Sequence, residues 1–197
     1  MPSPVPAAHC RHRRAVLAAC LDFSHLEAGL NAATGPAQEI LARVHSTDWQ
    51  AWAIPLRGRV STYDAALVVP AFEAFVTASS PDQAHDAYNA FLDAVGHNHS
   101  GTPFAAMAPG ARLLAQLVPH LEAGGPAGME ALTDCVWWSS DEPRFTGPDG
   151  VECDLAHETT EAARALSALA RSWLCSGDEE HRRAAASLLE VLAQLPN

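Results

Sequence analysis

The sequence lacks several features that would place it in a common class. It has 197 residues and no lysine, since all 12 of its basic residues are arginine. No apolar run approaches the roughly 20 residues that cross a membrane. No CxxC pair occurs, and the five cysteines are odd in number and widely spaced. These absences predict a protein of the reducing cytoplasm with free thiols, rather than a membrane protein or a disulfide-bonded one.

Motifs of the common nucleophilic and phosphate-binding enzymes are also missing. The sequence contains no G-x-S-x-G, no cysteine in a known catalytic context, and no glycine-rich loop that follows a strand. Its hydrophobic fraction of 48% is nevertheless that of a folded protein. We therefore expect a folded domain that needs no cofactor, with a flexible tail at residues 1–10 and one domain over residues 11–197.

Charge is distributed unevenly along the chain. Residues 1–60 carry six arginines and four carboxylates, a net of +2, whereas residues 61–197 carry six arginines and nineteen carboxylates, a net of −13. Such acidity repels phosphate backbones and disfavours nucleic-acid binding, including DNA repair on a helical scaffold. It would attract a basic protein and raise the association rate. The alternative is that the acidity serves solubility alone.

Apolar spacing predicts helices through most of the chain, and no period-two alternation persists, so the fold class is all-α. Ser80-Pro81 is a strong helix start, with serine as N-cap and proline at the first helical position, and Gly96 is a natural stop. Another helix is expected after Asp178. Pro70 predicts a kink or an interruption of a helix, Pro109-Gly110 predicts a kink, and Gly124-Gly125-Pro126 predicts a turn. Residues 139–158 are expected to form a long irregular loop.

Two segments of the chain read as copies of one unit. Residues 61–76 align with residues 101–116 at an offset of 40, and each begins with a small residue and threonine before an apolar helical pattern. The alignment predicts helix-pair starts at Thr62 and Thr102. A repeat of this period is typical of stacked helix pairs, which form a solenoid that works by presenting a surface.

The same segments resemble a known group of proteins. Asp86–Thr102, with its Gly-His-Asn-His-Ser-Gly-Thr ending, resembles the Gly-Asn-Asn-His-(Ala/Ser)-Gly-Thr motif of bacterial HEAT-like repeat proteins, which are common in actinobacteria. Val60–Phe72 resembles the Gly-Thr-Val-Tyr-Glu-Ala-Thr segment of that group, and Asp22–Glu27 resembles its acidic-aromatic opening. The absence of lysine beside abundant alanine, proline and glycine also fits a high-GC bacterial genome.

This resemblance implies a short HEAT-like α-α superhelix and says little about function. Most members of the group are unassigned, and some lie beside polymorphic toxins and look like immunity proteins. The chain departs from the pattern where His97 replaces the first asparagine, where Pro103-Phe104 replaces an aromatic pair, and at Val60-Ser61. A ligand held at those positions in relatives would not bind here.

His97 and His99 form the first candidate site. A His-x-His pair can bind Zn²⁺ or Fe²⁺ when further ligands complete the shell. The further ligands considered are Asp93, Cys153, Asp154 and His157. The resulting hypothesis is a metal- or cofactor-dependent enzyme. The alternative is that Asn98 and His99 cap the turn between two helices.

The second candidate is an acidic run from Asp134 to Glu158 that includes the pair Trp137-Trp138. Adjacent tryptophans on a helix point about 100° apart, so one can pack in the core while the other anchors a partner. The oxygens of the run do not follow the calcium-loop pattern. The leading hypothesis is a protein-interaction scaffold, most concretely an immunity protein or inhibitor that binds a basic partner. The residues predicted to bind it are Trp138, Asp141, Glu142, Asp149, Glu152 and Asp154.

Overall fold

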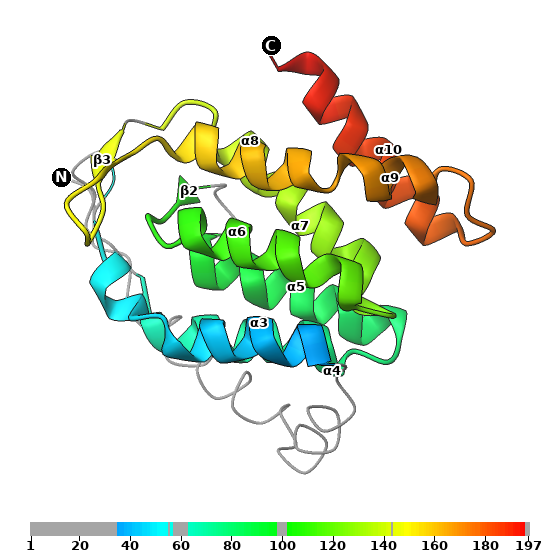
Figure 1. Cartoon of the computed structure of the whole chain (residues 1–197), viewed down its shortest axis with the longest axis horizontal. Coiled ribbons are helices and arrows are strands. Elements are labelled where there is room, and N and C mark those ends of the chain that lie inside the picture. Colours follow the sequence, from blue (N-terminus) through cyan, green and yellow to red (C-terminus); the bar gives the residue numbers. More distant parts are fainter. Residues whose placement is uncertain (1–34, 55, 57–62, 98–101, 143, 196–197) are drawn as a thin grey trace, which may run out of the picture.

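Helices form most of the structure (Figure 1), a computed structural model that describes residues 35–54, 56, 63–97, 102–142 and 144–195. The predicted tail at residues 1–10, the acidic-aromatic opening and Thr62 lie outside the described residues. The α-helices are α3 (Gly35–Ser46), α4 (Val68–Thr77), α5 (Pro81–Val95), α6 (Met107–Leu117), α7 (Gly124–Ser139), α8 (Leu155–Ala165), α9 (Ser167–Trp173) and α10 (Glu179–Gln194). The 3-10 helices are η1 (Trp49–Trp52), η2 (Ala65–Leu67) and η3 (Val118–His120).

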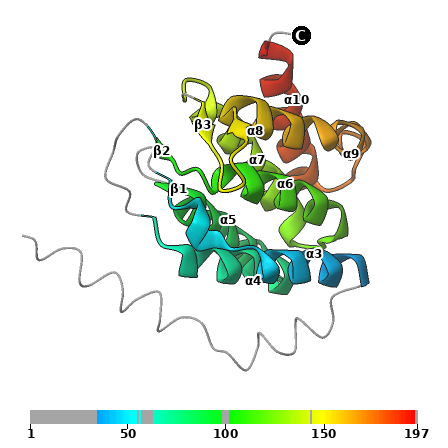
Figure 2. The same cartoon turned by 60° about the vertical axis from the view of Figure 1, so that its left-hand side comes forward.

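Two short hairpins depart from the expected all-α pattern. β1 (Gly96–His97) pairs antiparallel with β2 (Thr102–Pro103), and β3 (Phe145–Thr146) pairs antiparallel with β4 (Glu152–Cys153). Figures 1 and 2 place both hairpins at the same end of the helices. Each strand is two residues long, too short for alternation to be visible in the sequence. The coarse prediction of a mostly helical protein is confirmed.

α7 lies at the centre of the packing. It contacts α5 and α6 on one side and α8 and α10 on the other, while α3 packs against α4 and α6. Phenylalanine rings join α4 to α5: Phe72 meets Phe91 edge-on with ring centroids 5.5 Å apart, and Phe75 meets Phe91 at 6.0 Å. The start of α7 approaches the α4 backbone closely, because a Cβ added at Gly124 would lie 2.5 Å from the Phe75 carbonyl oxygen.

Three prolines that predicted kinks or a turn lie instead in first helical turns. Pro70, Pro109 and Pro126 are each the third residue of their helix, in α4, α6 and α7. These predictions are wrong because the N–H groups of a first turn have no partner within the helix, so proline sacrifices no hydrogen bond there. The expected cap at Thr102 is also wrong, since Thr102 belongs to β2 and α6 begins at Met107.

The predicted starts of α5 and α10 are confirmed. Ser80 accepts a hydrogen bond from the Gln83 N–H at the start of α5, and Asp178 accepts from the Glu180 and His181 N–H groups at the start of α10. α5 ends before Gly96, as expected, but Gly96 is extended and is the first residue of β1. The strongest local signals therefore located helix starts correctly.

The 40-residue offset agrees with the helix boundaries. Applied to α4 (Val68–Thr77), it gives residues 108–117, which fall within α6 and share its end. Applied to α5 (Pro81–Val95), it gives residues 121–135, which overlap α7. The α4–α5 pair and the α6–α7 pair thus occupy corresponding positions in the sequence. In addition, no helix in the described ranges is long and apolar enough to cross a lipid bilayer.

Candidate functional site

The segment predicted as an irregular loop, residues 139–158, contains a short hairpin and the first residues of α8. α7 continues to Ser139, the β3–β4 hairpin follows, and α8 begins at Leu155. The turn-rich residues close the hairpin: the Gly147 N–H donates to the Val151 carbonyl at 2.8 Å, and Asp149 accepts from the Val151 N–H at 3.1 Å. Gly150 has a φ of 79°, a conformation that favours glycine.

One face of this hairpin packs inward and the other faces solvent. Phe145 and Cys153 lie opposite each other in the ladder, and so do Thr146 and Glu152. The Phe145 ring meets Trp52 edge-on with centroids 6.5 Å apart, and Cys153 is 9% exposed. Burial raises the pKa of the Cys153 thiol, which favours its neutral form. Thr146 and Glu152 are exposed. The hairpin therefore presents a fixed polar surface.

Arg144 organises the carboxylates of this surface, and sequence reasoning missed it. Its guanidinium contacts Glu152 at 3.0 Å and Asp154 at 3.2 Å. Asp154 also caps α8 by accepting from the His157 N–H at 3.1 Å. That backbone hydrogen bond and the arginine hold the pKa of Asp154 below its usual value. We call Asp141, Glu142, Asp149, Glu152 and Asp154, with Arg144, the acidic hairpin surface.

Two other members of the acidic run lie elsewhere. Asp134, on α7, accepts a hydrogen bond from the Tyr88 hydroxyl on α5, and burial raises the pKa of its carboxyl group. Glu158 pairs with Arg112 of α6 at 3.4 Å. The members of the acidic run therefore lie in three different environments. Glu152 and Asp154, in the acidic hairpin surface, share Arg144 as a partner.

The tryptophan pair at the end of α7 is divided between core and surface. Trp137 is 53% exposed, whereas Trp138 is partly buried and packs against the core. A Cβ added at Gly96 would lie 3.0 Å from the Trp138 ring, so β1 covers one side of that ring. The expectation of one inward and one outward tryptophan agrees with the structure. The more accessible member is Trp137, whereas Trp138 was predicted to bind a partner.

The structure leaves the metal hypothesis as a prediction. His97 belongs to β1, where it pairs with Thr102, and His99 lies outside the described residues. Of the further ligands considered, Asp154 is engaged by Arg144 and the α8 backbone, and Cys153 is buried. Across the described part of the chain, no group of three or more histidine, cysteine, aspartate or glutamate side chains is arranged to hold a metal ion.

Comparison with known proteins returned no match to any family model, curated protein or solved structure. The resemblance to HEAT-like repeat proteins therefore stays a prediction that rests on the motif residues.

Proposed function

We propose that the protein is an interaction module that binds a basic protein partner through the acidic hairpin surface and Trp137. The observation that carries the proposal is an exposed indole two residues before the end of α7, where the chain leads directly into the acidic hairpin surface. Exposed tryptophans contribute strongly to binding when a partner covers them. A large aromatic side chain and nearby charges supply an anchor and a steering field respectively.

The electrostatics of the described residues support a basic partner. They include seven arginines and 21 carboxylates, a net of −14. Such a field accelerates association with a positively charged protein and slows association with nucleic acid. Within the acidic hairpin surface, Arg144 offsets part of the charge of Glu152 and Asp154. A basic partner would therefore gain more from the carboxylates of Asp141 and Asp149 than from those of Glu152 and Asp154.

An inhibitor of a basic, nucleic-acid-binding toxin is the most concrete form of this function. The acidity would mimic the phosphate backbone that such a toxin binds. The scaffold proposed for it is a short HEAT-like solenoid, supported by the 40-residue correspondence between the α4–α5 and α6–α7 pairs. Stacked helix pairs of this kind hold a binding surface rigid.

Co-expression with basic proteins encoded beside the gene tests the proposal. We expect one of them to copurify in a stable complex, and the complex to dissociate as salt is raised, because salt screens surface charges. Neutralising the acidic hairpin surface should weaken the complex about tenfold or more. The variant for this test is Asp141→Asn with Glu142→Gln and Asp149→Asn.

A matched control removes the same charge from another surface. Asp82, Asp86 and Asp93 are exposed on α5, and their replacement by asparagine also removes three charges. If the acidic hairpin surface is the binding site, this control should keep affinity within about threefold of the wild type. Equal losses in the two variants would contradict a defined site and indicate a response to net charge. Absence of any basic partner would contradict the function itself.

A further inference from the structure

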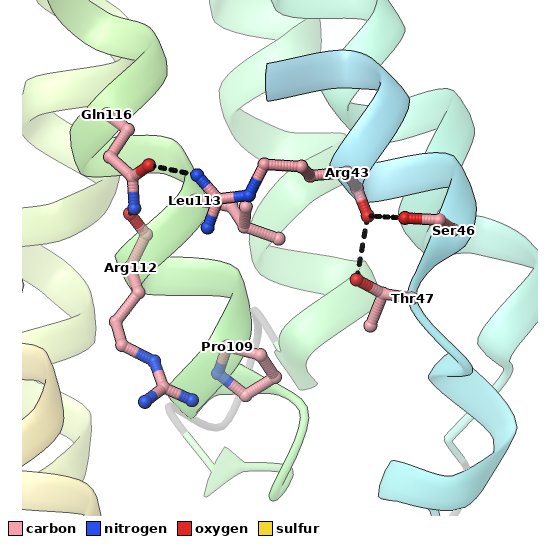
Figure 3. Close-up of a pocket in the computed structure, with 7 residues that line it drawn as sticks. All are labelled: Arg43, Ser46, Thr47, Pro109, Arg112, Leu113 and Gln116. Atoms are coloured by element: carbon pink, nitrogen blue, oxygen red, sulfur yellow. Dashed lines mark hydrogen bonds between the residues drawn. The ribbon is translucent and has the colours of Figure 1, made fainter. Parts of the chain in front are cut away.

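A cavity of about 360 Å³ lies between α3 and α6 (Figure 3). One wall comes from the last turn of α3 and the residue that follows it, and the other comes from the first three turns of α6. Every lining residue belongs to the described part of the chain. The lining residues are Arg43, Ser46, Thr47, Pro109, Arg112, Leu113 and Gln116.

The charge of the cavity is opposite to that of the chain. Two of the seven arginines in the described residues line it, whereas none of the 21 carboxylates there does. Glu158 is not a lining residue, but its carboxylate pairs with Arg112 at 3.4 Å. Two cationic side chains at one concave site in an acidic protein would concentrate anions locally.

The arginines are held in place by contacts that leave donors available. Arg43 extends from α3 toward α6 and donates to the Gln116 side-chain oxygen at 2.5 Å (Figure 3). The Arg112 guanidinium is held by its ion pair with Glu158 of α8 at 3.4 Å. A guanidinium carries several N–H donors, so these contacts leave donors on Arg43 and Arg112 for a ligand. Planar donor pairs of this kind match carboxylate and phosphate oxygens.

The remaining walls suit the rest of a small organic molecule. The Ser46 and Thr47 hydroxyls donate to the backbone carbonyl oxygen of Arg43 at 3.1 and 2.8 Å. Without these donors, that oxygen would repel an anion. Both hydroxyl oxygens keep acceptor capacity for a ligand hydroxyl. Pro109 and Leu113 add an apolar surface from α6. The volume is within the range of pockets that hold small molecules.

We propose that this cavity binds a small organic oxyanion, which the positive charges of Arg43 and Arg112 attract and whose apolar part packs against Pro109 and Leu113. The ligand would bridge α3 and α6, and it would therefore bind the folded state and raise the melting temperature. The proposal does not depend on a protein partner, because none of its residues belongs to the acidic hairpin surface.

Calorimetric titration of the full chain at low salt tests the proposal with inorganic phosphate, phenyl phosphate and benzoate. We expect phenyl phosphate or benzoate to bind more tightly than inorganic phosphate, because the apolar ring adds contacts. Phenyl phosphate binding alone would assign a phosphate site, and benzoate binding alone a carboxylate site. No binding by any of the three probes would overturn the proposal.

Three variants test whether the ligand binds in the cavity. Arg43→Gln and Arg112→Gln should each weaken binding about tenfold or more, because each removes a charged donor pair. Arg171→Gln is the matched control: Arg171 is exposed on α9, and its loss removes the same charge without altering the cavity. Circular dichroism checks that all three fold. Equal weakening by all three variants, or none by the two cavity variants, would overturn the proposal.

Discussion

The two ends of α7 are built from opposite kinds of contact. At its start, Gly124 and Gly125 allow the Phe75 backbone and the Trp173 ring to approach closely, and a side chain at Gly124 would overlap its neighbour. At its end, Trp137 is half exposed and is followed by the acidic hairpin surface. Turn hydrogen bonds and exposed ion pairs hold that surface in place. The comparison indicates that one end of α7 serves stability, whereas the other can serve binding.

The largest difference between the two ends should appear on truncating a buried side chain. Leu132 is fully buried in α7, so Leu132→Ala should lower the free energy of unfolding by about 2–5 kcal/mol. Trp137→Ala, at the exposed end, should lower it by less than about 1 kcal/mol. Urea denaturation of both variants measures these changes. A larger loss in Trp137→Ala would show that this tryptophan is structural.

Adding one methyl group at the start of α7 should also destabilise the protein. The Cβ of Gly124→Ala would lie 2.5 Å from the Phe75 carbonyl oxygen, whereas a Cβ at Gly177 meets nothing within 4 Å. We expect Gly124→Ala to cost about 1–3 kcal/mol, because the backbone must shift. Gly177→Ala is the control and should leave the melting temperature nearly unchanged. Equal melting temperatures in the two variants would contradict the close packing.

Two aspartates should give opposite dependences on pH. Burial raises the pKa of Asp134, so its charged form is disfavoured in the fold, and its contribution to stability grows as pH falls toward about 4. Hydrogen bonding lowers the pKa of Asp154, so its contribution is present above about pH 4 and is lost as pH falls further.

Asparagine at either position removes the titration while keeping an acceptor oxygen. Unfolding measured between about pH 2 and 7 should show the wild type gaining stability relative to Asp134→Asn as pH falls. Over the same range, the wild type should lose stability relative to Asp154→Asn. Changes of the same sign in both comparisons would contradict the assigned surroundings.

The smallest effect on stability is expected at Arg144. Its side chain is 66% exposed, as is that of Glu152, with which it pairs, so water and salt screen the interaction. Arg144→Gln should therefore melt close to the wild type. It should bind a basic partner faster at low salt, because the charge of Glu152 and Asp154 is no longer offset. Slower association would show that Arg144 contacts the partner directly.

Local signals predicted helices well where the capping chemistry was unambiguous, as at Ser80 and Asp178. They failed at Pro109 and Pro126, because proline is common in a first helical turn as well as at a kink or in a turn. The choice depends on where the helix begins, and α6 and α7 begin without a side-chain cap that the sequence could reveal. The strands β3 and β4 have two residues each and were too short to predict.

The candidate site was harder to predict because its contacts connect separate elements. Arg144 meets Glu152 and Asp154 only once the hairpin register brings positions eight and ten residues apart together. The spacing of apolar residues also could not show which of Trp137 and Trp138 is exposed. α7 is covered on several sides, so a stripe through Leu132 and Val136 does not show which other face is open.

The most direct test of the account measures the affinity of Trp137→Ala for the basic partner found by co-expression. Leu174→Ala is the control, since Leu174 is another large apolar side chain on the surface, 43% exposed directly after the end of α9. We predict that Trp137→Ala weakens the complex about tenfold or more, that Leu174→Ala leaves it within about twofold, and that both melt close to the wild type. Equal affinities for the two variants would contradict a binding surface at the end of α7.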